Sequence, residues 1–241
     1  MSGPPGRPEG EAAELLALPA GQWKIIHGVA AFVTGIGASL VAAVPVLPGG
    51  ITPFEAFAVV GPAQSLATIA VVAALKRFSR PALEDLGFRF TFADAWGLPA
   101  GALLQIVLSL LLSVVVVVFF SGEAPVQDVV QVVDEAAGLG TRMAVVITAV
   151  LLAPVAEEVV FRGVLLRALA HRLPRWAAAV GSAGAFALGH LLDPNAGLAV
   201  PALFVAGLVL AWQVLKSGRL GGAIAMHAGF NLLSVLLLFF T

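Results

Sequence analysis

The sequence predicts an all-α, polytopic integral membrane protein, a bundle of about seven transmembrane helices. Hydrophobic residues make up 60% of the 241 residues and charged residues only 11%, and the mean hydropathy is +1.02. A soluble domain carries roughly 25% charged residues, which it needs to cover a surface that faces water. The apolar residues also gather into stretches of about 20, the length that crosses the hydrocarbon core as a helix.

Seven such stretches follow one another along the chain. Their approximate bounds are 25–47, 54–75, 96–120, 143–169, 176–192, 197–215 and 220–240. The fifth and sixth are short and almost adjacent, so we interpret them as a tight hairpin of two spanning helices rather than a hairpin that only partly enters the bilayer. Residues 1–22 are polar and lack the apolar core of a signal peptide. We therefore expect a flexible polar leader over 1–22 and a single transmembrane domain over 23–241.

The basic residues predict the orientation of the bundle, because short cytoplasmic loops collect Lys and Arg. With seven spans and a cytoplasmic N-terminus, every Lys and Arg falls on the cytoplasmic side except Arg142, which lies outside, and Arg162, which lies within a span. The outer segment 121–142 is rich in acidic residues, as expected. The sequence thus predicts a cytoplasmic N-terminus and an external C-terminus.

The charge balance and the missing residue types exclude several kinds of function. A net charge of −1 provides no basic surface for nucleic acid. The absence of Cys excludes thiol nucleophiles and Cys-ligated metals, and the absence of Tyr excludes any mechanism that needs a phenol.

A few charged or strongly polar side chains lie inside the predicted spans, where each charge costs about 2.5–3.5 kcal/mol. They are Glu157, Glu158 and Arg162 in the fourth span, His190 at the end of the fifth, and His227 and Asn231 in the seventh. Glu158 and Arg162 are four residues apart and share a helix face, which predicts an ion pair. Glu157 points about 100° away and is left without a partner on its own helix.

Helix geometry places Glu157 and the polar residues of the fifth and seventh spans in one layer of the bilayer, at about 1.5 Å of rise per residue. A carboxylate in apolar surroundings is suited to take a proton from water, and an imidazole beside it can orient that water. His227 and Asn231 share a helix face and offer two donors to a developing oxyanion. This set is suited to the hydrolysis of an amide by activated water. In an alternative interpretation, Glu157, His190 and His227 bind zinc, with water in the open fourth position.

Three motifs occur in order on these spans. They are Glu-Glu-x-x-x-Arg from Glu157 to Arg162, Phe-x-x-x-His from Phe186 to His190, and His-x-x-x-Asn from His227 to Asn231. In this order they resemble the CAAX protease and bacteriocin-processing family of intramembrane proteases, also called CPBP or Abi, to which the Ras-converting CAAX endopeptidase is related. The resemblance covers about 145–235, within an expected catalytic core at 143–241.

The resemblance implies an intramembrane endopeptidase that cuts a membrane-associated protein or peptide near its C-terminus. It implies that Glu157 activates the water and that His190 assists it. The same resemblance assigns the stabilisation of the oxyanion to His227 and Asn231. Bacterial members act in peptide maturation, bacteriocin immunity or the removal of sorting tails, and the composition of this chain favours a bacterial cell membrane.

The remaining motif residues are assigned a supporting role by the same resemblance. Glu158 and Arg162 hold the site together, and Phe186 lies one turn below His190. The family has been described both as metalloproteases and as glutamate-dependent enzymes. We expect no cofactor, because Asn231 is a better donor than a metal ligand, and zinc is the alternative.

A non-enzymatic membrane protein is the second hypothesis: a transporter, or an immunity protein that sequesters a peptide. In that case Glu157 is a structural acid or a proton-relay group, and the His and Asn side chains are polar contacts between helices. Transporters often have paired halves with broken helices, and the sequence has no such symmetry. The protease is therefore the preferred hypothesis.

Overall fold

The computed structural model describes residues 23–79, 86–120, 130–131 and 138–240, which contain helices and no strand. Six helices of this part of the chain are long and apolar enough to cross a membrane. They are Ile25–Ala43, Pro53–Leu75, Phe92–Phe120, Leu139–Ala170, Val200–Ser217 and Gly221–Phe240. The predicted helical membrane bundle is thus confirmed. The predicted leader, 1–22, lies outside the described residues, and the orientation of the bundle stays a prediction.

The fifth predicted span, 176–192, differs from the others. Its α-helix, α10 (Arg175–Gly189), ends after 15 residues, where the chain tightens into the 3-10 turn η7 (His190–Leu192), and a second turn, η8 (Pro194–Leu198), follows. Fifteen residues of α-helix extend about 22 Å, against a hydrocarbon core of about 30 Å. The described residues therefore contain six helices of spanning length rather than seven. The predicted hairpin is present, because α10 packs along α11 (Val200–Ser217), but only α11 has the length of a spanning helix.

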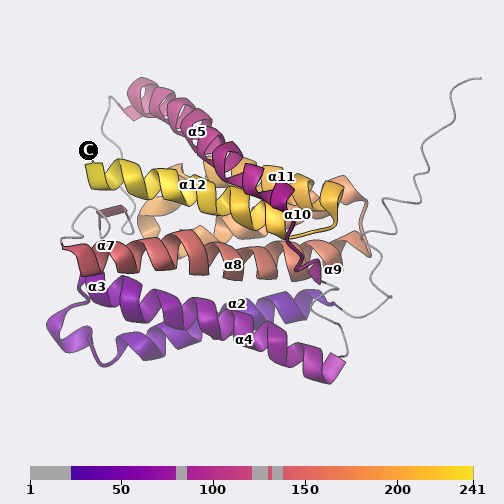
Figure 1. The fold of residues 1–241 in the computed structure, drawn as a ribbon, viewed down its shortest axis with the longest axis horizontal. Coiled ribbons are helices and arrows are strands. Elements are labelled where there is room, and N and C mark those ends of the chain that lie inside the picture. The colour runs from indigo at the N-terminus through magenta and orange to yellow at the C-terminus, as the bar shows by residue number, and fades with distance from the viewer. Residues whose placement is uncertain (1–22, 80–85, 121–129, 132–137, 241) are drawn as a thin grey trace, which may run out of the picture.

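One long helix, Leu139–Ala170, runs through the middle of the bundle, and we call it the central helix (Figure 1). It is composed of α7 (Leu139–Val145), η5 (Val146–Leu152), α8 (Ala153–Glu158), η6 (Val159–Leu165) and α9 (Leu166–Ala170). The segments η5 and η6 are π-helical, so α8 lies between two widened turns. Such turns occur frequently at functional sites.

The other helices surround the central helix (Figure 1). The pair α2 (Ile25–Ala43) and α4 (Gly61–Ser79) lies on one side and α12 (Gly221–Phe240) on the other, while α10 and α11 pack behind. Short elements lead into α4 and α5: η1 (Leu47–Gly49), α3 (Pro53–Glu55), η2 (Ala56–Val60) and η4 (Phe92–Trp96). The largest apolar core lies between the central helix, α10 and α11, and includes Val164, Leu166 and Val214.

Helix α5 (Gly97–Phe120) crosses α12 closely and then projects away from the bundle (Figure 1). A Cβ atom on Gly101 would collide with the backbone of Met226, and one on Gly229 would collide with the backbone of Leu98. The two glycines therefore allow the close crossing. Leu108 is the last buried residue of α5. The later turns of α5 face outward, and the helix forms one wall of a cavity.

Candidate active site

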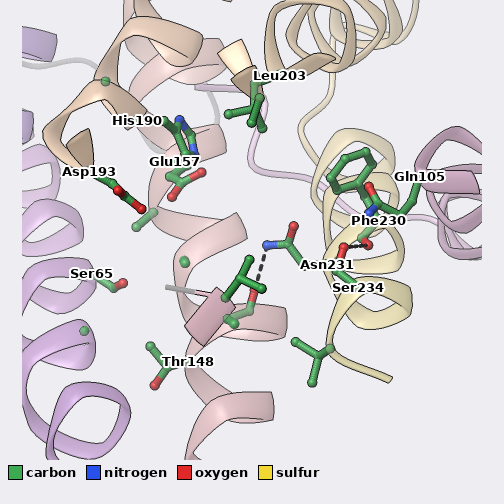
Figure 2. A pocket seen from close by; sticks show the side chains of 18 of the residues that line it. Ser65, Gln105, Thr148, Glu157, His190, Asp193, Leu203, Phe230, Asn231 and Ser234 are labelled. Atoms are coloured by element: carbon green, nitrogen blue, oxygen red, sulfur yellow. Dashed lines mark hydrogen bonds between the residues drawn. The ribbon is translucent and has the colours of Figure 1, made fainter. Parts of the chain in front are cut away.

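A cavity of about 670 Å³ lies beside α8, with α4 on one side and α5 on the other. Glu157, His190 and Asn231 all line it, so the fold brings these predicted site residues from three helices to one space. Figure 2 shows Glu157 and His190 at the same end of the cavity and Asn231 farther along. Asn231 donates from Nδ2 to the backbone oxygen of Ala149 at 2.8 Å, which leaves one N–H and the carboxamide oxygen for another partner.

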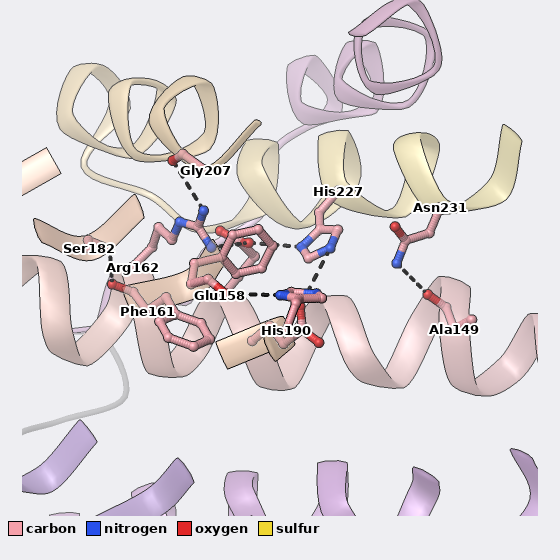
Figure 3. Close-up of polar contacts among 11 residues, drawn as sticks. Ala149, Glu158, Phe161, Arg162, Ser182, His190, Gly207, His227 and Asn231 are labelled. Carbon is pink, nitrogen blue, oxygen red and sulfur yellow. Dashed lines mark hydrogen bonds and ion pairs between the residues drawn. The ribbon is translucent and has the colours of Figure 1, made fainter. Parts of the chain in front are cut away.

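The predicted ion pair between Glu158 and Arg162 is confirmed. Nη1 of Arg162 donates to Oε1 of Glu158 at 2.9 Å, and both side chains are fully buried. Nη2 of the same guanidinium donates to the backbone oxygen of Gly207 on α11 at 3.1 Å (Figure 3). Its Cζ atom also lies 4.5 Å from the centroid of the Phe186 ring. These contacts compensate the desolvation of a charge that would otherwise be strongly destabilising.

His227 of α12 contacts both glutamates of α8. Its Nδ1 lies 2.9 Å from Oε1 of Glu158, and its Nε2 lies 3.6 Å from Oε2 of Glu157. An ionised carboxylate can only accept, so Nδ1 carries the proton in the bond to Glu158. The side chain of Glu157 is 32% exposed and that of His227 only 6%, so Glu157 faces the cavity while His227 supports it.

Phe186 connects the two histidines of the site. Its ring meets the His190 imidazole edge-on at 4.9 Å between centroids and the His227 imidazole at 5.6 Å. The predicted placement of the aromatic ring one turn from His190 is thus confirmed. Nδ1 of His190 donates to the backbone oxygen of Phe186 at 2.9 Å, because a carbonyl can only accept. In its neutral form, His190 therefore presents Nε2 as an acceptor.

Residues 139–233 match the family model described as type II CAAX prenyl endopeptidase Rce1-like. The chain contains an Rce1-like region. This match confirms the resemblance inferred from the three motifs, all of which lie within it. The Rce1-like region begins at α7 and ends within α12, so the helices before it are outside the match. No curated protein and no solved structure matches the chain.

Helices outside the Rce1-like region provide cavity residues that the sequence analysis missed. Gln64 and Ser65 of α4 and Gln105 and Ser109 of α5 line the cavity together with Glu157. The sequence analysis weighed charged residues, His and Asn within the spans, but not Gln. A Gln side chain within an apolar span is also costly to bury, and this was the signal that could have identified Gln64 and Gln105.

The zinc alternative requires Glu157, His190 and His227 to converge as ligands. In the described part of the chain, no group of three or more His, Asp or Glu side chains is arranged to hold a metal ion. His227 instead directs its two ring nitrogens at the two glutamates of α8. The absence of a cofactor stays a prediction with zinc as its alternative, and the mechanism below has no step through a metal.

Proposed function

We propose that the protein is an intramembrane endopeptidase that hydrolyses a peptide bond of a membrane-associated protein or peptide, near its C-terminus, in a bacterial cell membrane. One observation carries the proposal: the Glu157 carboxylate faces a cavity between membrane helices and contacts an imidazole that a second glutamate holds. The Rce1-like match supports the class of enzyme. The lipid bilayer and the substrate are the partners that this function needs, and no cofactor is part of the proposal.

In the proposed first step, Glu157 takes one proton from a water molecule in the cavity while the water oxygen attacks the substrate carbonyl carbon. Nε2 of His190 accepts a hydrogen bond from the second hydrogen of that water and so fixes its orientation. Both groups lie at the same end of the cavity (Figure 2). A C–O bond forms, and the carbonyl oxygen becomes an oxyanion.

In the proposed second step, His227 and Asn231 stabilise the oxyanion, and the C–N bond then breaks. In this step His227 donates from Nε2, which lies 3.6 Å from Oε2 of Glu157, while Nδ1 keeps its hydrogen bond to Glu158. Asn231 donates the N–H that Ala149 does not use. Glu157 returns its proton to the leaving amine, which restores the carboxylate.

Glu157→Gln tests the proposal, because glutamine keeps the size of the side chain and cannot serve as the base. A general base contributes a factor of about 10²–10⁴ to the rate, so its removal lowers the rate by that factor. We therefore expect the cleavage rate of quenched fluorescent membrane peptides in proteoliposomes to fall by that factor. The midpoint of thermal unfolding should stay unchanged. Retained cleavage in this variant would falsify the proposal, and retained protection or transport would favour the non-enzymatic alternative.

Glu55→Gln is the matched control. The carboxylate of Glu55 accepts from the backbone nitrogen and the hydroxyl of Thr52, outside the cavity. Glutamine retains this capping contact at a helix N-terminus. The cleavage rate of this variant should equal that of the unmodified protein.

A further inference from the structure

The cavity contains uncharged polar side chains that the proposed reaction does not use. They are Gln64 and Ser65 on α4, Gln105 and Ser109 on α5, and Ser234 on α12. Figure 2 shows Ser65 and Gln105 on opposite sides of the cavity. Polar side chains on lipid-embedded helices are costly unless they are paired, so their position around one cavity needs an explanation.

These side chains retain unused hydrogen-bonding capacity. Nε2 of Gln105 donates to Oγ of Ser109 at 3.2 Å, and Oγ of Ser234 donates to the backbone oxygen of Phe230 at 3.1 Å. For Gln64 and Ser65 no hydrogen bond to another described residue is formed by the side chain. A glutamine offers two N–H donors and an oxygen acceptor. The two walls therefore offer both donors and acceptors to an occupant of the cavity.

The charges that line the cavity limit the chemistry of the occupant. Among the described lining residues there is no Lys or Arg, and the charged side chains are Glu157 and Asp193. Figure 2 shows both of these near His190, at one end of the cavity. The rest of the lining is apolar or uncharged. An anionic group there would have no cation to pair with, so the occupant is uncharged over most of its length.

An unwound peptide segment has the properties that this lining matches. Water can attack a peptide carbonyl only where the helix around it is opened. Each N–H and C=O that is then freed in the membrane costs several kcal/mol unless it finds a partner. We propose that Gln64 and Ser65 on one wall and Gln105 and Ser109 on the other bind the backbone of an unwound, uncharged peptide segment beside the scissile bond. This inference rests on the proposed function.

A binding experiment with the Glu157→Gln variant tests the backbone site separately from catalysis. The probe is a 12-residue peptide of Leu, Ala and Gly with blocked ends and an uncharged fluorophore. A second probe has esters in place of alternate amides, which removes N–H donors without adding bulk. Because each lost hydrogen bond to a buried partner weakens binding by up to about tenfold, we expect the amide peptide to bind at least ten times more tightly.

Substitutions on the two cavity walls should remove the preference for the amide peptide over the ester peptide. Adding Gln64→Leu and Gln105→Leu should bring the ratio of the two dissociation constants close to unity. Ser109→Ala should reduce the ratio, whereas Ser113→Ala should not, because Ser113 is exposed one turn farther along α5 and donates to its own helix. Equal binding of both peptides, no binding of either, or an unchanged ratio in the leucine variants would each overturn the inference.

Cleavage by the unmodified protein is measured in parallel on the amide peptide and on membrane peptides. Binding that depends on the amide N–H, together with no cleavage of any peptide, would refute the proposed function and leave the backbone site standing. Cleavage without a preference for the amide peptide would refute the backbone site alone.

Discussion

In the central helix, half of the residues in the spanning window are buried within the protein, whereas in Phe92–Phe120 only 6% are buried. The order of hydropathy is the reverse, because Phe92–Phe120 has the higher mean value, 2.9 against 2.1. In a soluble protein the more apolar helix would be the more buried one. In a bilayer, lipid tails are as apolar as leucine, so burial gives an apolar side chain little advantage over lipid.

Polar groups explain the difference between these two helices. The central helix carries Glu157, Glu158 and Arg162, which must be shielded from lipid and paired, and α10, α11 and α12 enclose them. In Phe92–Phe120 the one charge is Asp94, which pairs with Arg219 at 3.1 Å before α5 begins. Helix α5 itself carries no charge and needs only a close crossing with α12 to stay attached. The Rce1-like region is therefore held together by its polar network, and the helices before it act mainly as cavity walls.

The largest expected effect comes from breaking the network at Arg162. Arg162→Ala leaves Glu158 as an uncompensated buried charge, which costs about 3–5 kcal/mol of unfolding free energy. Arg142→Ala is the control, because it removes only a cation–π contact: the Cζ atom of Arg142 lies 5.0 Å from the centroid of the Phe239 ring. This variant should lose about 0.5–1 kcal/mol of unfolding free energy. Denaturation in mixed detergent micelles measures both. Equal losses of unfolding free energy in the two variants would show that the polar network does not hold the Rce1-like region together.

A slightly smaller effect is expected on the cleavage kinetics, and it distinguishes residues that take part in the reaction from residues that bind the substrate. Asn231→Ala removes one proposed oxyanion donor and should lower kcat by about 10²–10³, or about 2.7–4 kcal/mol, with little change in KM. Gln105→Leu on α5 should instead raise KM by about tenfold with kcat unchanged. Steady-state kinetics on one membrane peptide distinguishes the two. A fall in kcat for the α5 variant would contradict the assignment of that helix as a wall.

The contrast in packing can be tested with two leucines. Leu166 is fully buried in the core between the central helix and its neighbours, and Leu111 on α5 is 60% exposed. Leu166→Ala should cost about 2–3 kcal/mol, because the cavity it leaves is enclosed by protein. Lipid refills the space left by Leu111→Ala, so we expect a much smaller loss. The same unfolding assay would contradict this comparison if the α5 variant lost as much stability.

Sequence spacing predicted the contacts that lie within one helix. Glu158 and Arg162 pair at four residues, and Phe186 meets His190 at the same spacing. No spacing rule predicts the contact of His227 with Glu158, because these residues are 69 positions apart and only the packing of α12 on α8 brings them together. The resemblance named the residues of the candidate site, but it did not give this geometry.

The number of spans and the cavity walls were harder to predict. Hydropathy identifies apolar residues at 176–192 but not the change to a 3-10 turn at His190, which shortens α10. Gln64 and Gln105 lie far apart in the sequence, on helices outside the motifs. Their meeting around one cavity depends on how α4 and α5 pack on the Rce1-like region.

The smallest expected effect is that of metal removal. In the described residues no group of three or more His, Asp or Glu side chains is arranged to hold a metal ion, and Nε2 of His227 lies 3.6 Å from Oε2 of Glu157. A strong zinc chelator should therefore leave the cleavage rate unchanged, and elemental analysis of purified protein should find no stoichiometric zinc. Stoichiometric zinc with turnover that the chelator abolishes would instead mean that Glu157, His190 and His227 rearrange around an ion. In that case the polar network would position the ligands of a metal ion, and Glu157 would be one of these ligands rather than the general base.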